Sequence, residues 1–224
     1  MLKPGIRCIK KKDLFYIAHS DHQVKKYKPW LGDAFSFLYD FIMKISVFPK
    51  KLGADMGQHY EILSRELKDT HAKPTLELGT GSGSAVHFLP VDNPYTGTDV
   101  SPGLLKKAVK AFHATGFDQA EFYVTGADDL PFRNDTFSLC LCILSLNFFG
   151  DAGGVFQETK RVLVPGGFFI CSVPVPERNR LQRTIRGRLY SEKELAKICG
   201  ETGFRFETLP FENGALLYFK AILQ

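Results

Sequence analysis

The segment that most constrains the fold is ELGTGSG at residues 77–83, where three glycines alternate with other residues. Residues 74–78 before it have strand character, and a run with helical character begins near Ser82. Alternate glycines let the backbone approach a ligand closely and adopt positive φ, and the N–H groups at the start of a helix can hold a carboxylate. The segment therefore predicts a ligand-binding turn between a strand and a helix. Nucleotide-binding proteins use similar turns, so this turn alone does not identify the ligand.

From residue 75 onward, short strand-like runs alternate with helix-like runs, which indicates βαβ units around a parallel sheet. Residues 136–144 form a nearly unbroken apolar run, as expected for a central strand that is buried on both faces. The predicted fold is α/β and doubly wound, with a mostly parallel seven-stranded sheet and an antiparallel C-terminal hairpin strand. Its strands are expected at residues 74–78, 95–100, 121–124, 136–144, 168–173, 204–209 and 215–223.

Two of the predicted helices carry clear start signals. Ser101 and Pro102 have the residue types of an N-cap and of a first helical position. Ser191 and Glu194 have the spacing of a capping box, and Gly203 is placed to end the helix that they begin. Both helices lie in the part of the chain that alternates strands and helices.

Residues 1–73 differ in character from the rest of the chain. Residues 34–45 and Met56–Leu67 have helical periodicity, and Pro49 and Gly53 separate them. A core built from these residues alone would be too small for an independent domain. We therefore expect residues 1–73 to form an N-terminal helical lid or flank, and residues 74–224 to form the ligand-binding domain.

The net charge of +5 is unevenly distributed along the chain. Residues 1–52 contain 11 Lys and Arg against four Asp, whereas the remainder contains 18 basic against 20 acidic residues. A basic front segment could contact phosphates or an anionic lipid surface, although a solvated lysine-rich face is the simpler interpretation. No basic run with interleaved aromatic residues follows a nucleic-acid-binding module, so a nucleic-acid partner is not expected.

Cysteine usage and hydropathy limit the class of protein further. Five cysteines without a C-x-x-C pair argue against a disulfide framework and against a zinc site. The N-terminal residues lack a signal-peptide core, and no apolar stretch reaches membrane-spanning length. We therefore expect a soluble, cytoplasmic protein without a bound metal.

Asp99 adds a second element to the glycine-rich turn. It ends the second predicted strand, 20 residues after Gly79, where an acid that accepts hydrogen bonds from ribose hydroxyls is expected. Asp99 could also support the start of the helix that follows Ser101, and the two roles are compatible. The spacing thus favours a ligand that contains a ribose.

Four segments together resemble the class I methyltransferases that depend on S-adenosylmethionine (SAM). Within that family the resemblance is to the type 11 subgroup, which includes the quinone-biosynthesis C-methyltransferases. The segments are LELG at 76–79, YTGTDVS at 95–101, GADDLPF at 126–132 and RVLVPGG at 161–167. The resemblance covers about the last two-thirds of the chain and, faintly, the Tyr39-Asp40 pair. It implies a Rossmann-like fold, SAM as cofactor with S-adenosylhomocysteine as its product, no metal, and a small-molecule methyl acceptor.

The resemblance also implies which residues contact the cofactor, and all of them lie at or just after the ends of predicted strands. They are Glu77, Gly79, Thr80, Gly81, Gly83, Asp99, Val100, Ala127, Asp128, Ile143 and Leu144. Glu77 would position the methionine amino group, and the glycine loop would lie beside the methionine and the ribose. Asp99 would bind the ribose hydroxyls.

The remaining cofactor residues lie at or after the ends of the second, third and fourth predicted strands. Val100 would pack on the adenine ring, and Ala127 with Asp128 would meet the edge of that ring. Ile143 and Leu144 would lie near the methionine end of the cofactor.

Three positions depart from the subgroup's pattern. The subgroup usually has an acid where Gly126 stands, so the adenine contact would pass to Asp128 or to the backbone. An acid is also common where Ser138 stands, and many relatives have His in place of Asn147. These departures leave open a second interpretation, in which the chain is a catalytically degenerate SAM-binding interaction module.

The acceptor site is less defined, because methyl transfer depends on orientation and does not require a general base. Asn147, Tyr39 and His59 are the candidates for catalysis; the alternative is a helix-start role for Asn147 and packing or exposure for Tyr39 and His59. Arg180 and Arg183 lie in an arginine-rich segment and are suited to an anionic acceptor, although a solvated loop is the simpler interpretation. An apolar or aromatic acceptor, favoured by the many phenylalanines, is the other possibility.

Overall fold

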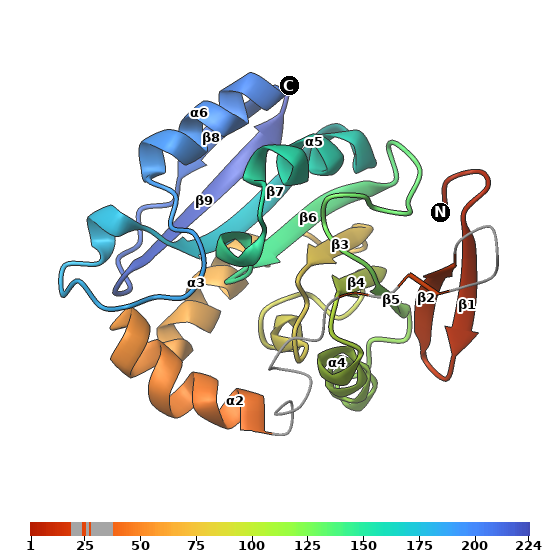
Figure 1. Ribbon diagram of the computed structural model, residues 1–224, viewed down its shortest axis with the longest axis horizontal. Coiled ribbons are helices and arrows are strands. Elements are labelled where there is room, and N and C mark those ends of the chain that lie inside the picture. Colours follow the sequence, from red (N-terminus) through yellow and green to blue (C-terminus); the bar gives the residue numbers. More distant parts are fainter. Residues whose placement is uncertain (19–23, 26, 28–37) are drawn as a thin grey trace.

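The computed structural model describes residues 1–18, 24, 25, 27 and 38–224, and it contains one nine-stranded sheet (Figure 1). Two strands come from the N-terminal part of the chain and seven from residues 75–223. The strands are β1 (Arg7–Lys11), β2 (Leu14–Ala18), β3 (Thr75–Leu78), β4 (Tyr95–Asp99), β5 (Ala120–Val124), β6 (Phe137–Ile143), β7 (Leu163–Pro174), β8 (Phe204–Thr208) and β9 (Leu216–Leu223).

The strand order is β1-β2-β5-β4-β3-β6-β7-β9-β8, and all pairs from β2 to β7 are parallel. Strand β9 pairs antiparallel with both β7 and β8. The predicted doubly wound, mostly parallel sheet with an antiparallel C-terminal strand is therefore confirmed. The sheet is wider than the predicted seven strands because the β1–β2 hairpin extends one end of it (Figure 1).

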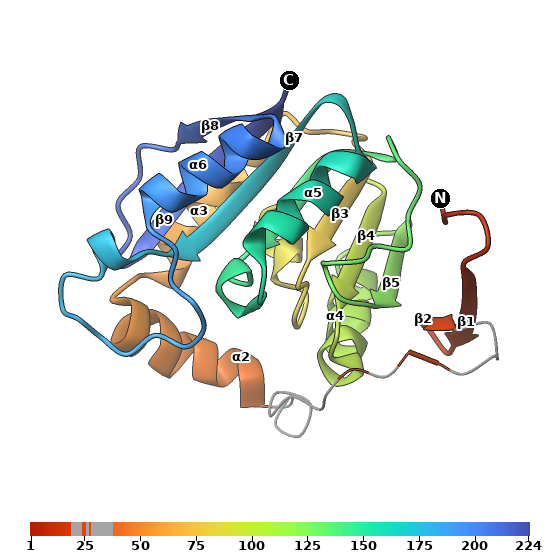
Figure 2. The same cartoon turned by 45° about the horizontal axis from the view of Figure 1, so that its top comes forward.

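The helical elements connect these strands in sequence order. They are α2 (Tyr39–Ile42), the π-helix η2 (Met43–Leu52), α3 (Met56–Leu67), α4 (Pro102–Ala114), α5 (Ala152–Val162), α6 (Glu192–Thr202) and the short 3₁₀ turns η3 (Ser84–His87), η4 (Leu146–Phe148) and η5 (Pro176–Arg178). Helices α5 and α6 lie on one face of the sheet and α3 on the other (Figure 2).

Strand β6 shows why the sheet is buried on both faces. Leu139, Leu141 and Ile143 pack toward the face that α3 and α4 cover, whereas Cys140 and Cys142 pack toward α5 and α6. Because successive side chains of a strand point to opposite faces, only a continuous apolar run can fill both layers. The two cysteines are buried, free thiols that fill the core.

The predicted helix starts are confirmed. The Ser101 side chain accepts a hydrogen bond from the Leu104 N–H at 3.1 Å, and Pro102 opens α4. The capping box of Ser191 and Glu194 is complete at the start of α6.

The prediction of a helix after the glycine-rich turn is wrong. This segment forms only the four-residue 3₁₀ turn η3. Gly83 has a φ of +91° and so stands outside helical geometry. Pro90 follows closely and cannot continue a helix. The segment is therefore too short for a full α-helix.

The prediction of a helical N-terminal flank is also wrong in part, because this flank contains the strands β1 and β2. Strands β1 and β2 form a hairpin around Lys12 and Asp13, where Lys12 takes a φ of +57°. Two-residue hairpin turns with positive φ usually contain Asn or Gly, so Lys-Asp carries no clear turn signal in the sequence. The chain packs these strands onto β5, where Phe15 stacks on Tyr123 with ring centroids 4.8 Å apart.

Helix α3 is confirmed with the predicted bounds, but Pro49 does not separate two helices as expected. The π-helix η2 continues through Pro49 and ends at Gly53, whose N–H donates to the Phe48 carbonyl. The predicted helical run at residues 34–45 lies outside the described residues up to residue 37. No helix among the described residues is long and apolar enough to cross a bilayer.

The hairpin contributes to the core, which predicts a stability effect for Leu14→Ala. Leu14 is buried in the cluster that also contains residues of α4. The substitution should lower the free energy of unfolding by about 2–5 kcal/mol, because it removes buried apolar volume. Urea unfolding measures this loss, with Asp13→Ala in the exposed turn as the control. Equal unfolding curves for both variants would show that the hairpin is not docked on the sheet.

Candidate functional site

The glycine loop after β3 takes a conformation that only glycine accommodates. Gly79, Gly81 and Gly83 have φ values of +73°, +57° and +91°. A Cβ on Gly79 would lie 2.5 Å from the Ser145 Cβ, and one on Gly83 would lie 2.8 Å from the Ala108 Cα. At Gly81 the nearest atom is the Tyr39 hydroxyl at 4.0 Å. The first and third glycines thus permit close packing, whereas the middle one borders a space where a ligand can approach the backbone.

This loop stands where the winding of the sheet changes direction. Strand β3 lies between β4 and β6, and the chain proceeds first to one side of it and then to the other. The N–H groups of Gly79 and Thr80 donate to the Thr98 carbonyl, each at 2.9 Å. The Ser145 hydroxyl, just after β6, donates to the Leu78 carbonyl at 2.7 Å. In doubly wound sheets, ligands bind in the crevice outside the carboxyl ends of the strands at this switch point.

Asp99 connects the glycine loop to the end of β4. Its carboxylate accepts a hydrogen bond from the Gly81 N–H at 2.9 Å and another from the Ser101 N–H at 2.9 Å. These bonds orient the Asp99 carboxylate between the glycine loop and the start of α4. The bond from the Ser101 N–H supports the start of that helix, and the ribose contact stays a prediction.

Glu77 is buried beneath the loop, on the same face of the sheet as Tyr95. Its carboxylate accepts a hydrogen bond from the Tyr95 hydroxyl, and the Thr80 hydroxyl lies 3.1 Å from that of Tyr95. Burial raises the pKa of Glu77 to about 8, against the lowering effect of the Tyr95 hydrogen bond. Glu77 is therefore held in a position where a nearby positive charge would favour its ionised form.

The turn after β5 explains the departure at Gly126. A Cβ on Gly126 would lie 2.6 Å from the Asp128 Oδ1, so the Asp128 carboxylate occupies the space that a side chain at position 126 would need. Ala127 is buried between them. The Tyr27 ring lies 3.6 Å from the same Cβ position, and its hydroxyl donates to Thr125 at 3.3 Å. Sequence reasoning missed Tyr27, which no local motif marks.

Helix α2 brings two further side chains to the loop. Asp40 accepts a hydrogen bond from the Ser82 hydroxyl at 2.5 Å and forms an ion pair with Lys107. Burial raises the pKa of Tyr39 to about 12, and the charge of Asp99 adds to this effect. Tyr39 is therefore a protonated hydroxyl near Gly81. Asp40 was missed as a site residue, because its partner Ser82 lies 42 residues away in the sequence.

Asn147 lies buried just after β6. Its Nδ2 donates to the Arg186 carbonyl at 2.7 Å, and its own carbonyl accepts the Arg188 N–H at 2.7 Å. Its Oδ1 has no hydrogen-bond partner among the described residues. Asn147 therefore connects the segment after β7 to the end of β6. Its Oδ1 is a buried acceptor that is not used by the described residues.

Residues 76–171 match the family model described as a methyltransferase domain. The ubiquinone/menaquinone biosynthesis C-methyltransferase UbiE of Desulfotalea psychrophila is 31% identical over 147 residues, which cover 64% of this chain and 56% of that protein. The demethylmenaquinone methyltransferase of Thermotoga maritima is 26% identical over 172 residues, 75% of this chain and 69% of that protein. These matches show that residues 76–171 are similar to methyltransferase domains.

Solved structures of methyltransferases share the fold of this chain. A SAM-dependent methyltransferase from Aquifex aeolicus superposes with a TM-score of 0.64 at 16% identity, over 84% of this chain and 98% of that one. The chain spans about half the length of several curated relatives that it matches, 56% of the Desulfotalea protein and 46% of the Bacillus subtilis methyltransferase YcgJ. Its own activity and acceptor are therefore treated below as proposals.

The cofactor residues expected in a methyltransferase domain of this family lie along one edge of the sheet. The glycine loop and Asp99 are in direct contact. Val100 is 37% exposed beside Asp99, as suits an apolar residue on which a ring could pack. Ile143 ends β6, and Leu144 follows with a φ of +57°, its N–H donating to the Ser172 carbonyl at 2.9 Å.

His59 stands apart from this edge in its contacts. Its Nδ1 lies 2.8 Å from the Tyr218 hydroxyl, to which the Asn213 side chain also donates at 3.1 Å. Burial lowers the pKa of His59 to about 3, so the imidazole is neutral at physiological pH. The hydrogen bond joins α3 to β9, which is a packing role.

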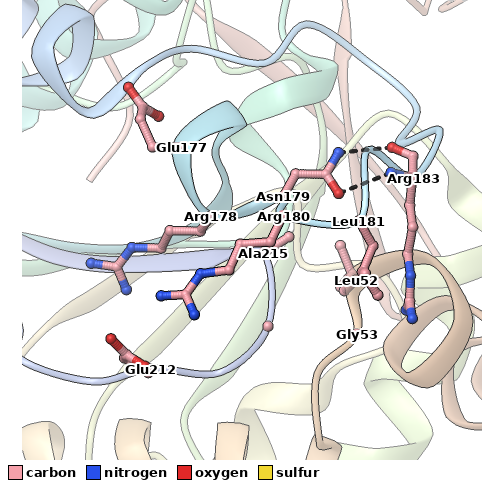
Figure 3. A pocket seen from close by; sticks show the side chains of 11 residues that line it. Leu52, Gly53, Glu177, Arg178, Asn179, Arg180, Leu181, Arg183, Glu212 and Ala215 are labelled. Carbon is pink, nitrogen blue, oxygen red and sulfur yellow. Dashed lines mark hydrogen bonds between the residues drawn. The ribbon is translucent and has the colours of Figure 1, made fainter.

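The arginine-rich segment after β7 borders a pocket of about 550 Å³ (Figure 3). Arg183 lines this pocket but donates to the Pro49 carbonyl at 2.7 Å, so it fastens the segment to η2. Arg178 donates to the carbonyls of Phe211 and Leu216. Arg180 lines the same pocket and makes no hydrogen bond or ion pair within the described part of the chain.

No group of three or more His, Cys, Asp and Glu side chains in the part of the chain that the structure describes is arranged to hold a metal ion.

The buried Glu77 predicts how stability depends on pH. Its pKa is about 8 in the folded protein, against 4.5 for an ordinary Glu. Between those values the folded state holds a proton that the unfolded state has lost, so stability falls as the pH rises through this window. Glu77→Gln should remove this decline, which amounts to at most about 1.4 kcal/mol per pH unit.

Urea unfolding of the ligand-free protein at a series of pH values between about 5 and 8 measures the effect. Glu61→Gln, on the exposed side of α3, is the matched control. If the free energy of unfolding changed with pH in the same way for Glu77→Gln and for the unchanged protein, Glu77 would not hold the proposed proton.

Proposed function

We propose that this chain transfers a methyl group from SAM to a small-molecule acceptor. The observation that carries the proposal is the hydrogen bond between the Gly81 N–H and the Asp99 carboxylate at the switch point of the sheet. It joins a backbone cradle for the methionine part of the cofactor to an acceptor for ribose hydroxyls. The similarity of residues 76–171 to methyltransferase domains supports the same cofactor.

The residues present fit this cofactor. The space beside Gly81 admits the ligand to the backbone, and the Asp99 carboxylate lies at the same loop as a hydrogen-bond acceptor. Val100 offers an exposed apolar surface for adenine, and Asp128 replaces the acid that relatives carry at Gly126. When bound, SAM supplies an electrophilic methyl group on a sulfonium.

The residues of the chain contribute mainly by orientation in this proposal. Methyl transfer requires the acceptor atom to lie in line with the methyl–sulfur bond, with water excluded. Tyr39 is protonated at physiological pH and His59 is engaged with Tyr218, so neither is poised as a base toward an acceptor. Asn147 has an unpaired buried Oδ1 and is the best-placed group to orient a donor on the acceptor.

We also propose that residues 1–73 serve the domain of residues 74–224 and do not fold alone. The pairing of β2 with β5, the His59–Tyr218 contact and the Asp40–Ser82 hydrogen bond support this. The cytoplasmic location expected from the sequence stays a prediction.

The cofactor proposal predicts that Asp99→Ala weakens binding of S-adenosylhomocysteine by about tenfold or more. The substitution removes charge-assisted hydrogen bonds to the ribose, which contribute about 1.5–3 kcal/mol. Isothermal titration calorimetry measures the change, with the exposed Asp118→Ala as control.

Equal affinity in the Asp99→Ala and Asp118→Ala variants would contradict the assignment of Asp99. A second result separates the enzyme from a degenerate binding module. If SAM binds tightly but is not consumed when a pool of small molecules is added, the result would favour the degenerate SAM-binding module.

The free guanidinium of Arg180 predicts an anionic group on the acceptor. If the acceptor carries a carboxylate or phosphate, Arg180→Ala should raise its KM by about tenfold and leave kcat nearly unchanged, because a binding contact is lost. Arg186→Ala is the control, since that side chain does not line the pocket. An unchanged KM in Arg180→Ala would exclude this role.

A further inference from the structure

The helix formed by α2 and η2 is apolar on two opposite sides. Its inner side packs Met43, Val47 and Phe48 against the core cluster that contains α3 and α4. On its outer side, Phe41 is 59% exposed, whereas Ile42 and Ile45 are 41% and 44% exposed. A surface helix of a globular protein usually has polar residues opposite its buried stripe. The outer side of this helix therefore needs an explanation other than core packing.

The exposed apolar residues form one stripe. Leu38, 38% exposed, precedes Phe41 by three residues, Ile42 by four and Ile45 by seven. All four side chains are exposed, whereas Met43, Val47 and Phe48 of the same helix pack on the core, so the exposed set lies on its outer side. Single exposed apolar side chains are common on protein surfaces, but a contiguous patch marks an interaction site. We refer to Leu38, Phe41, Ile42 and Ile45 as the outer stripe.

Cationic side chains accompany the outer stripe. Lys44, Lys50 and Lys51 are exposed on η2, and none of them has an ion pair with another described residue. Asp40, the acid of this helix, is turned away to Ser82 and Lys107. The described part of the helix therefore presents apolar and positively charged groups to solvent without a compensating acid. It lies at the periphery of the molecule (Figure 1).

We infer that the outer stripe and its three lysines dock this protein onto an anionic lipid surface. An amphipathic helix in that position buries its apolar side chains at the boundary of headgroups and acyl chains. Each nearby lysine adds attraction to anionic headgroups. A symmetric contact with a second copy would bring like-charged lysines together, which opposes association. Charge complementarity thus selects the lipid surface over a second copy.

This docking does not depend on the proposed methyl transfer. The surface is formed by exposed side chains, whereas Tyr39 and Asp40 of the same helix contact the glycine loop at Gly81 and Ser82. Membrane binding can therefore be tested without SAM and without an acceptor.

The experiment is co-sedimentation of the full chain with vesicles of phosphatidylcholine alone or mixed with phosphatidylglycerol. We expect binding to the mixed vesicles, weaker binding to the neutral ones, and a loss of binding as salt screens the charges. The double variant Phe41→Ser with Ile42→Ser should bind the mixed vesicles at least about tenfold more weakly, because it removes two apolar side chains from the interface. Lys44→Glu should also weaken binding.

Two matched controls test the location of the surface. Val91→Ser removes an exposed apolar side chain near the amino end of β4, and Lys193→Glu reverses an exposed charge on α6. Both should bind as the unchanged protein does. Circular dichroism checks that each variant is folded.

Equal binding by the double variant and the unchanged protein would overturn the inference, as would absence of binding to the mixed vesicles. Analytical ultracentrifugation of the same proteins completes the test. A dimer that dissociates in the double variant, without vesicle binding, would also overturn it and assign the outer stripe to a second copy.

Discussion

The close approach of Gly79 to Ser145 is the constraint on which the rest of the site depends. These residues follow β3 and β6, the two strands between which the sheet changes its winding direction. Because no side chain fits between them, the Ser145 hydroxyl reaches the Leu78 carbonyl and fixes the edge of the sheet. The glycine loop then stands where its N–H groups meet Asp99 on the other side. The requirement for glycine at position 79 thus aligns the carboxyl ends of β3, β4 and β6.

The described residues of the N-terminal part of the chain, 1–73, pack against the sheet and the glycine loop. The β1–β2 hairpin extends the sheet, α3 is tied to β9 through His59 and Tyr218, and Asp40 reaches the glycine loop at Ser82. These contacts come from positions far apart in the sequence. They surround the cofactor edge without contributing a recognisable motif. Several of these residues, such as Asp40, His59 and Tyr218, lie outside the segment 76–171 that matches the methyltransferase domain model.

Local signals were enough to predict the sheet and the glycine-rich turn. The apolar run of β6 required burial on both faces, and the caps of α4 and α6 followed from single side chains that satisfy helix N-terminal N–H groups. The positive φ of the glycines and the place of Asp99 could be predicted because they depend on backbone conformation and on strand ends. The hairpin was missed, since Lys12 adopts positive φ without a glycine or asparagine to indicate it. The turn is held by packing of Leu14 and Phe15 instead.

By itself, the sequence determined the mostly parallel sheet and the position of the glycine-rich turn, because these depend on residues close together along the chain. The tertiary structure decided the contacts between residues far apart in the sequence. It placed the Asp128 carboxylate in the space beside Gly126, paired His59 with Tyr218, and engaged Arg183 with Pro49, whereas Arg180 has no hydrogen bond among the described residues. A side chain's partner depends on which strands and loops meet in space. No periodicity or spacing in the sequence contains that information.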